Sequence, residues 1–213
     1  PNAFSGVVNI ITKKTSGSRA EAQVTGGEHG YYNGALSLAY PIGPVGVKVS
    51  GSRQKADGDR YNTQFTNDNA SAAVSLAVDS TTAHLFFGYD NKEFGANGFY
   101  STRFPDQWEH TTTKLATADV QVSQGALLLS SQVSWRRNDD EYRLKYREPS
   151  FYQNIHRTNV YNVDVQASLV TGLGTTVLGG QYMQDDISST NLGDHARYNK
   201  GIFAEQTFAP VHN

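Results

Sequence analysis

The sequence contains no cysteine, and it has only one methionine, two tryptophans and six prolines among 213 residues. The absence of cysteine excludes a disulfide framework and a thiolate metal site. Charge of one sign is also lacking, because 18 Lys and Arg residues stand against 20 Asp and Glu residues and the formal net charge is −2. Nothing therefore indicates a nucleic-acid partner, which normally requires clustered positive charge.

Long apolar runs are missing as well. None approaches the roughly 18 to 20 residues that a helix needs to cross a bilayer, so a transmembrane helix is excluded. A β-barrel stays compatible with the low mean hydropathy, because its strands face lipid with only every second residue. The sequence starts at Pro1 without an initiator Met or a signal-peptide pattern, and it ends directly after an apolar stretch. We expect a fragment of a longer chain.

The dominant pattern is alternation of apolar and polar residues with period two, which is typical of strands with one apolar face. In residues 32–40, for example, Leu36 and Leu38 face one way, and Ser37 and Ala39 face the other. The same alternation recurs in residues 45–49, 72–78, 83–89, 116–122, 127–135 and 161–169. Helical spacing is nearly absent, so the sequence predicts an all-β fold, an antiparallel meander of about ten strands.

The polar face is rich in Ser, Gln, Asn, Ala, Gly and Asp, the mixture expected of a wet barrel lumen. Aromatic residues on the apolar face lie near strand ends, as in the interfacial girdles of membrane barrels. These aromatics are Tyr32, Tyr40, Tyr89, Trp135 and Tyr161. They would fit the core of a β-sandwich equally well, so this feature does not decide between the two architectures.

Connection lengths favour the barrel. Tight turns are predicted at residues 41–44, 79–81, 123–125 and 171–174, and they alternate with long polar connections at residues 53–68, 91–110, 136–157 and 185–200. Bacterial outer-membrane barrels have short periplasmic turns and long extracellular loops in this arrangement. A soluble sandwich has no reason to place every long loop at one end, although a soluble β-sandwich binding module stays an alternative.

The first residues, from Phe4 to Lys14, read FSGVVNIITKK. This run resembles the last plug strand of TonB-dependent outer-membrane receptors. Residues 93–100, 104–109 and 154–161 are similar to a receptor branch that is common in Bacteroidetes and often described as cobalamin-receptor-like. The resemblance implies that residues 1–16 end a plug domain. It also implies that residues 17–213 form the N-terminal part of a transmembrane barrel of about 22 strands.

The resemblance further implies active, TonB-dependent uptake of a large scarce nutrient, cobalamin-like or a ferric siderophore, across the outer membrane of a Gram-negative bacterium. The implied partners are a TonB-type energy-transducing protein that contacts the missing plug region, the lipid bilayer, lipopolysaccharide and an extracellular small-molecule ligand. A passive porin or adhesin barrel stays an alternative. An enzyme is not expected, because the six His residues are scattered without metal-site spacing. No cofactor is expected to be required.

Two predicted loops carry candidate binding residues. Exposed aromatics on a flexible loop can bury an apolar ligand, and the connection at residues 91–110 has four such candidates. They are Phe99, Tyr100, Phe104 and Trp108. Alternatively, this loop packs over the barrel mouth on its own aromatics. In the connection at residues 53–68, Asp57 and Asp59, with residues 67–69 at its far end, have the hard oxygen donors that calcium prefers, although a solvated turn is the default interpretation.

Two adjacent arginines, Arg136 and Arg137, follow the girdle residue Trp135. Their guanidinium groups could meet lipopolysaccharide phosphates, although internal pairing with the acids at residues 139–141 is the default.

Overall fold

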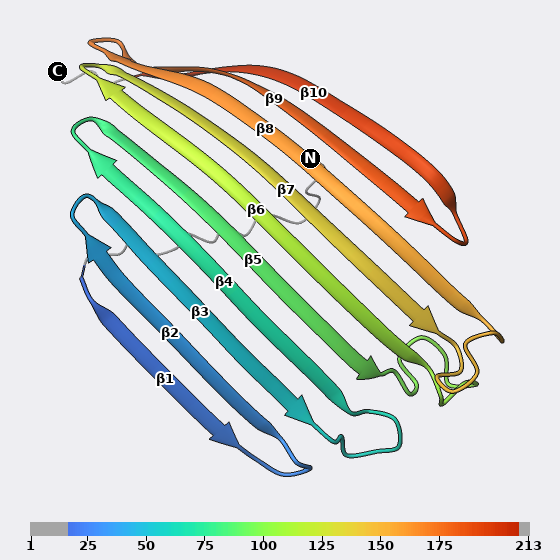
Figure 1. Cartoon of the computed structure of the whole chain (residues 1–213). Helices are drawn as coiled ribbons and strands as arrows, with labels where there is room; N and C mark the ends of the chain where they lie inside the picture. Colours follow the sequence, from blue (N-terminus) through green and yellow to red (C-terminus); the bar gives the residue numbers. More distant parts are fainter. Residues whose placement is uncertain (1–16, 209–213) are drawn as a thin grey trace.

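A computed structural model describes residues 17–208 as one antiparallel sheet of ten strands, which follow one another in chain order (Figure 1). The strands are β1 (Arg19–Gly26), β2 (Tyr32–Ile42), β3 (Val45–Ala56), β4 (Phe65–Val78), β5 (Thr81–Gly95), β6 (Trp108–Gln124), β7 (Leu127–Arg143), β8 (Gln153–Thr171), β9 (Gly174–Ser189) and β10 (Gly193–Phe208). The predicted all-β meander is confirmed. The predicted plug strand lies outside the described residues, so the domain boundary after residue 16 stays a prediction. Residues 17–208 include no helix that could span a membrane.

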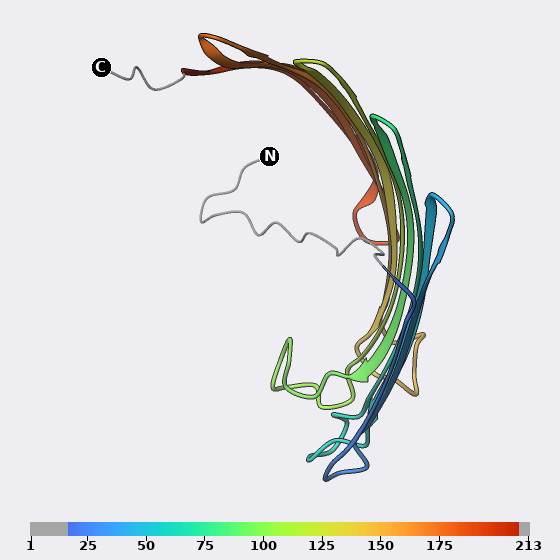
Figure 2. The ribbon, with the colours of Figure 1, turned by 90° about the vertical axis from the view of Figure 1, so that its left-hand side faces the viewer.

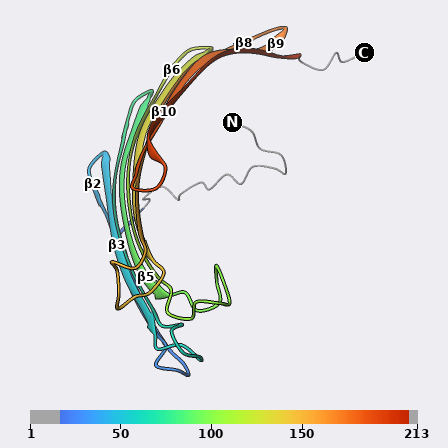
Figure 3. The ribbon, with the colours of Figure 1, turned by 90° about the vertical axis from the view of Figure 1, so that its right-hand side faces the viewer.

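The sheet is curved (Figure 2, Figure 3). Alternation along each strand gives it two chemically different faces. The connection between β5 and β6 bends to the concave side, where Phe99 packs on Phe94 of β5. The concave face carries mainly small polar residues, such as Ser50 and Ser71, whose hydroxyl oxygens lie 2.7 Å apart. The convex face carries exposed aliphatic and aromatic side chains. Among them are Leu36, Leu38, Val49, Val74, Leu85, Phe87, Val120, Leu129, Val133, Val165 and Leu178.

Burial within the protein is concentrated at one end of the sheet. Six of the described residues are buried: five lie where the longer connections meet the strands, namely Ala56, Gly95, Ala96, Gln107 and Trp108, and Gly46 lies beside a tight turn at the other end. The strands therefore surround no hydrophobic core of their own. A continuous apolar face is unfavourable in water, so the convex face requires an apolar medium, as the predicted lipid contact would supply.

Short and long connections alternate strictly, as predicted. Residues 43–44, 79–80, 125–126 and 172–173 form tight turns at the end of the sheet seen on the left of Figure 1. Gly43, Asp79 and Gly125 have positive φ angles there, which suits the hairpin turns that match strand twist. Residues 27–31, 57–64, 96–107, 144–152 and 190–192 connect the strands at the opposite end, called the loop end below.

The long connections are shorter than predicted. Residues 185–200 were expected to form a loop, but they belong mostly to the β9–β10 hairpin, whose connection is residues 190–192. Residues 67–69 likewise lie within β4. The strands continue past the span of about 9 to 11 residues that crosses a membrane, and β8 reaches 19 residues. Beyond that span both faces are polar, so the alternation ends while the backbone hydrogen bonds continue.

The two faces predict opposite tolerance to charge. In the full-length protein, we expect L85R to reduce the fraction that folds into phosphatidylcholine vesicles, because an arginine on the lipid face near the bilayer centre costs about 2 to 4 kcal/mol. The neighbouring concave substitution H84R is the control and should fold like the wild type. Protection from protease measures the folded fraction. Equal folding of L85R and H84R would show that the convex face does not meet lipid.

Candidate functional site at the loop end of the sheet

An aromatic cluster covers the concave face at the loop end. Phe99 and Tyr100, from the connection at residues 96–107, pack between Phe94 of β5 and Tyr142 of β7 in edge-to-face contacts. Ring centroids are separated by 6.1 Å for Phe94 and Phe99, 4.7 Å for Phe99 and Tyr100, and 5.2 Å for Tyr100 and Tyr142. Phe99 is 70% exposed and Tyr100 is 54% exposed. The aromatic cluster therefore offers open π surface to the space enclosed by the sheet.

Acidic groups lie beside the aromatic cluster. The Tyr100 hydroxyl donates a hydrogen bond to Glu109 of β6. Burial, followed by this bond and the Glu109 charge, raises the pKa of Tyr100. Burial also raises the pKa of Asp140, and the Glu109 carboxylate adds to this shift while His156 opposes it. One buried carboxylate oxygen of Asp140 has no hydrogen-bond partner among the described residues. The site thus combines aromatic surface with two carboxyl groups: Asp140, whose pKa is raised, and Glu109, which accepts a hydrogen bond from Tyr100.

Gln107 holds the connection at residues 96–107 in place. Its side chain is fully buried, and its Nε2 donates hydrogen bonds to the carbonyl oxygens of Ser101 at 2.7 Å and Phe104 at 2.6 Å. Its Oε1 accepts a hydrogen bond from the Tyr142 hydroxyl at 3.1 Å. One side chain therefore ties the fold of the loop to the strand that carries part of the aromatic cluster.

A second amide joins this loop to the preceding one. Asn62 Nδ2 donates to the carbonyl oxygens of Pro105 at 2.9 Å and Gln107 at 2.6 Å. The approach is so close that a Cβ atom at Gly95 would lie 2.4 Å from Asn62 Oδ1. Tyr61 also donates a hydrogen bond to Asp106. Residues 57–64 and 96–107 thus form one connected rim rather than two independent loops.

Trp108 does not join the other candidate aromatics. It is the first residue of β6, its side chain is 6% exposed, and alternation places it on the convex face with Glu93 and Arg143. Its Nε1 donates a hydrogen bond to Glu93 Oε1 at 2.9 Å, and the Arg143 guanidinium lies 4.6 Å from its ring. Tyr146, from residues 144–152, packs against it at 5.4 Å. The structure therefore separates Trp108 from Phe99 and Tyr100 and gives it a packing role.

Phe104 also stands apart from the aromatic cluster. Its carbonyl accepts one of the Gln107 hydrogen bonds, and the Arg103 guanidinium lies 5.7 Å from its ring. Of the four aromatics predicted from the sequence, the structure therefore brings together Phe99 and Tyr100.

The two predicted calcium ligands lie beside cations. Asp57 is 3.8 Å from Lys55 Nζ, and Asp59 is 3.7 Å from the Arg60 side chain. Asp68, predicted near them, forms an ion pair with Arg53 on the convex face of β3 and β4. Within residues 17–208 no group of three or more acidic or His side chains gathers in a way that could hold a metal. As placed, these residues do not fit the oxygen cage that calcium requires.

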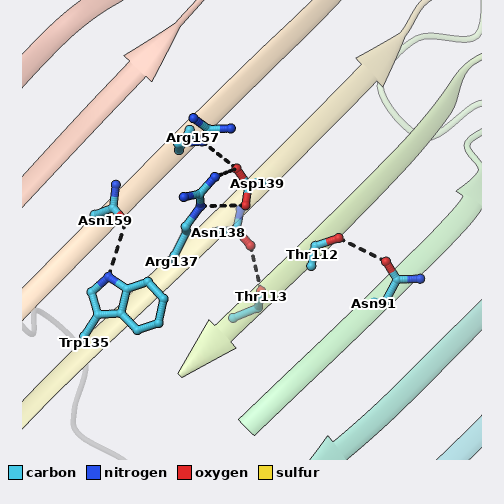
Figure 4. Close-up of polar contacts among 9 residues, drawn as sticks. All are labelled: Asn91, Thr112, Thr113, Trp135, Arg137, Asn138, Asp139, Arg157 and Asn159. Carbon is cyan, nitrogen blue, oxygen red and sulfur yellow. Dashed lines mark hydrogen bonds and ion pairs between the residues drawn. The ribbon is translucent and has the colours of Figure 1, made fainter. Parts of the chain in front are cut away.

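The adjacent arginines separate to opposite faces. Arg136 lies on the concave face, whereas Arg137 lies on the convex face with Asp139 and Arg157 (Figure 4). Asp139 accepts hydrogen bonds from Arg137 at 2.8 and 3.0 Å and from Arg157 at 2.8 Å. The hydrogen bonds from Arg137, together with those from Arg157, lower the pKa of Asp139. The internal pairing expected as the default is confirmed for Arg137.

Sequence reasoning did not identify Tyr142, Glu109, Asn62 or Gln107 as site residues. Tyr142 and Glu109 lie in stretches that were predicted to be loops, and extending the alternation of β6 and β7 would have paired them across the two strands. No local pattern distinguishes Asn62 and Gln107 from other polar loop residues, because their importance depends on contacts between loops.

No protein-family model and no curated protein matches the sequence. Among solved structures, the siderophore receptor PiuA from Acinetobacter baumannii matches 84% of this chain with 32% of its own, at a TM-score of 0.68 and 11% identity. The siderophore receptor PirA from Pseudomonas aeruginosa matches 93% of this chain with 36% of its own, at a TM-score of 0.68 and 12% identity. The copper transporter OprC matches 88% of this chain with 32% of its own, at a TM-score of 0.64 and 15% identity. The sheet has the fold of part of a receptor barrel. The chain spans about a third of the length of these structures.

Neighbouring carboxyls on β7 predict opposite pH dependence. Asp139 has a lowered pKa, so its stabilising effect is present above the carboxyl's unfolded pKa of about 4 and is lost as pH falls below it. Asp140 has a raised pKa, so its effect is present below about pH 4 and is lost as pH rises. Melting temperatures of the full-length protein in detergent should therefore fall in D139N at neutral pH only. The melting temperature of D140N should rise relative to that of the wild type as pH rises. Parallel profiles for the two variants would contradict the assigned environments.

The hydrogen bonds of Gln107 predict that its replacement destabilises the rim locally. We expect Q107L to destabilise residues 96–107 by about 1 to 3 kcal/mol, because it leaves the carbonyl oxygens of Ser101 and Phe104 without their donor. Hydrogen exchange of the amides in this connection should accelerate, while the central amides of β6 stay protected. Q124L, at the exposed turn end of β6, is the matched control. Unchanged exchange in Q107L would remove this residue as the anchor of the rim.

Proposed function

We propose that the chain is the N-terminal part of the barrel of a TonB-dependent outer-membrane receptor, which takes up a large scarce nutrient in a Gram-negative bacterium. The observation that carries the proposal is the amphipathic meander, with an apolar convex face and a polar concave face, and its likeness to segments of siderophore receptors and a copper transporter. The lipid bilayer is then the partner of the convex face, and a TonB-type protein supplies energy through a plug.

Within this function, the aromatic cluster is the proposed point of ligand capture. Phe99 and Tyr100 are exposed toward the concave side, and the rim built by Gln107 and Asn62 presents them in a fixed arrangement. Fixing these side chains before a ligand arrives reduces the conformational entropy that binding would otherwise cost. Open ring faces suit a ligand with apolar or π-rich surface, and we propose a ferric siderophore or a cobalamin. The activity is transport, with no covalent step and no cofactor.

The proposal predicts energy-dependent uptake that depends on the aromatic cluster. In cells that express the full-length protein, we expect uptake of a ferric siderophore or of cobalamin, each offered as a radiolabelled probe, and its loss on adding a protonophore. F99A and Y100A should raise the half-saturating concentration about tenfold, the effect of losing a well-placed aromatic contact.

F151A is the control for these variants, since Phe151 is a loop aromatic as exposed as Tyr100 that lies under Lys145, outside the aromatic cluster. Uptake that survives the protonophore would favour a passive porin instead. Energy-dependent uptake that F99A and Y100A leave unchanged would preserve the receptor and remove the aromatic cluster from its ligand site.

A further inference from the structure

We propose that the convex face of β6, β7 and β8 binds the phosphate groups of lipopolysaccharide through a cationic site formed by Lys114, Arg137 and Arg157. The inference rests on the proposed outer-membrane location. It concerns a surface that faces away from the aromatic cluster and from any transported ligand.

Strand register places these cations directly beyond the aromatic girdle. Trp135 and Tyr161 are neighbours across β7 and β8, and the next convex position along β7 is Arg137, which is paired with Lys114 of β6. Trp135 Nε1 donates a hydrogen bond to Asn159 Oδ1 at 3.3 Å, toward the loop end (Figure 4). Because girdle aromatics lie at headgroup level, the cations that follow them lie at the level of lipid phosphates.

The charge arrangement is unfavourable without an anion. Lys114 and Arg137 face each other directly across the β6–β7 ladder, and like charges in such a pair repel. Asp139 is already shared by Arg137 and Arg157, and Lys114 forms no ion pair with any residue of the described range 17–208. Three cations and one carboxylate leave two positive charges. A phosphate monoester carries about −1.5 to −2 charges, which matches this excess.

Nearby acids on the same face have other partners. Glu141 pairs with Arg143 at 2.6 Å, and Asp186 of β9 accepts hydrogen bonds from Gln184 at 2.8 and 3.0 Å. Glu141 is compensated by Arg143, whereas Asp186 keeps its charge because an amide is neutral. Asp186 lies on β9, three strands from Lys114 of β6, and forms no ion pair with the three cations. Two of the three cations are open to solvent, since Lys114 is exposed and the Arg157 side chain is 54% exposed, and the Arg137 side chain is 30% exposed. Arginine offers planar donors that bind phosphate oxygens in pairs.

The position favours a lipid over a free anion. Below the cationic site, the convex face continues into exposed apolar side chains, including Val133 and Val165. A lipid that places its phosphate at Lys114 and Arg137 can lay its acyl chains along this surface. Inorganic phosphate gains only the polar contacts, so the apolar contact adds affinity for the lipid alone.

The test uses the purified full-length protein in detergent micelles with diphosphoryl lipid A, dephosphorylated lipid A and inorganic phosphate as separate probes. We expect lipid A bound in native mass spectra, with the apparent dissociation constant raised at least about tenfold in K114A/R157A, the loss expected for charge-assisted hydrogen bonds. R136A is the matched control, because Arg136 is the sequence neighbour of Arg137 on the opposite face. Melting temperatures verify that each variant is folded, and K114Q/R157Q serves if the alanine variant is not.

Selective binding of the diphosphoryl lipid, weakened in K114A/R157A and unchanged in R136A, supports the site. Equal binding by K114A/R157A and the wild type overturns it, as does an equal loss in R136A or displacement by inorganic phosphate at concentrations comparable to the lipid. The proposed function fails separately, through absence of the protein from outer-membrane fractions or of energy-dependent uptake. Lipid binding in micelles depends on neither measurement.

Discussion

Backbone hydrogen bonding between neighbouring strands is the constraint on which the rest of this structure depends. In hydrocarbon, an unpaired peptide group costs several kcal/mol, so a membrane-crossing sheet must keep its ladder unbroken from strand to strand. The ladder here runs without interruption from β1 to β10. It also fixes the direction of every side chain, which is why only six of residues 17–208 are buried and the apolar side chains are left for the surroundings.

The parts of the fold that follow from this constraint could be predicted from the sequence. Alternation in segments such as residues 83–89 and 127–135 identified strands, their faces and the tight turns between them, because one face is apolar there. The same reasoning failed where both faces are polar. Residues 185–200 resemble a loop in composition, yet they pair over most of their length because the ladder continues beyond the end of the apolar face. The face on which Trp108 lies could not be predicted for the same reason: it is set by the register of a strand whose start the composition does not reveal.

Beyond the girdle, successive residues of β7 enter different environments. Arg136 and Asp140 lie on the concave face, and Arg137 and Asp139 lie on the convex face. Asp139 sits between two guanidinium groups, whereas Asp140 sits beside another carboxylate and is partly desolvated, so the pKa shifts of the two carboxyls have opposite signs. The environment of each charged side chain in this part of the strand therefore depends on the face that it occupies. A count of acids and bases along residues 136–143 would treat as one cluster what the sheet divides in two.

The candidate site results from the same division. Phe99 and Tyr100 reach the concave side only because the connection that carries them is held by Gln107 and Asn62, and both amides act on backbone carbonyls of the loop. Trp108 starts β6 on the opposite face, packed under Tyr146 and Arg143, and so fixes the point at which the loop returns to the ladder. The exposed Phe99 and Tyr100 are thus supported by the buried Trp108, which lies on the opposite face of the sheet. Loss of the buried ring should alter the position of Phe99 and Tyr100 without removing any group that a ligand would touch.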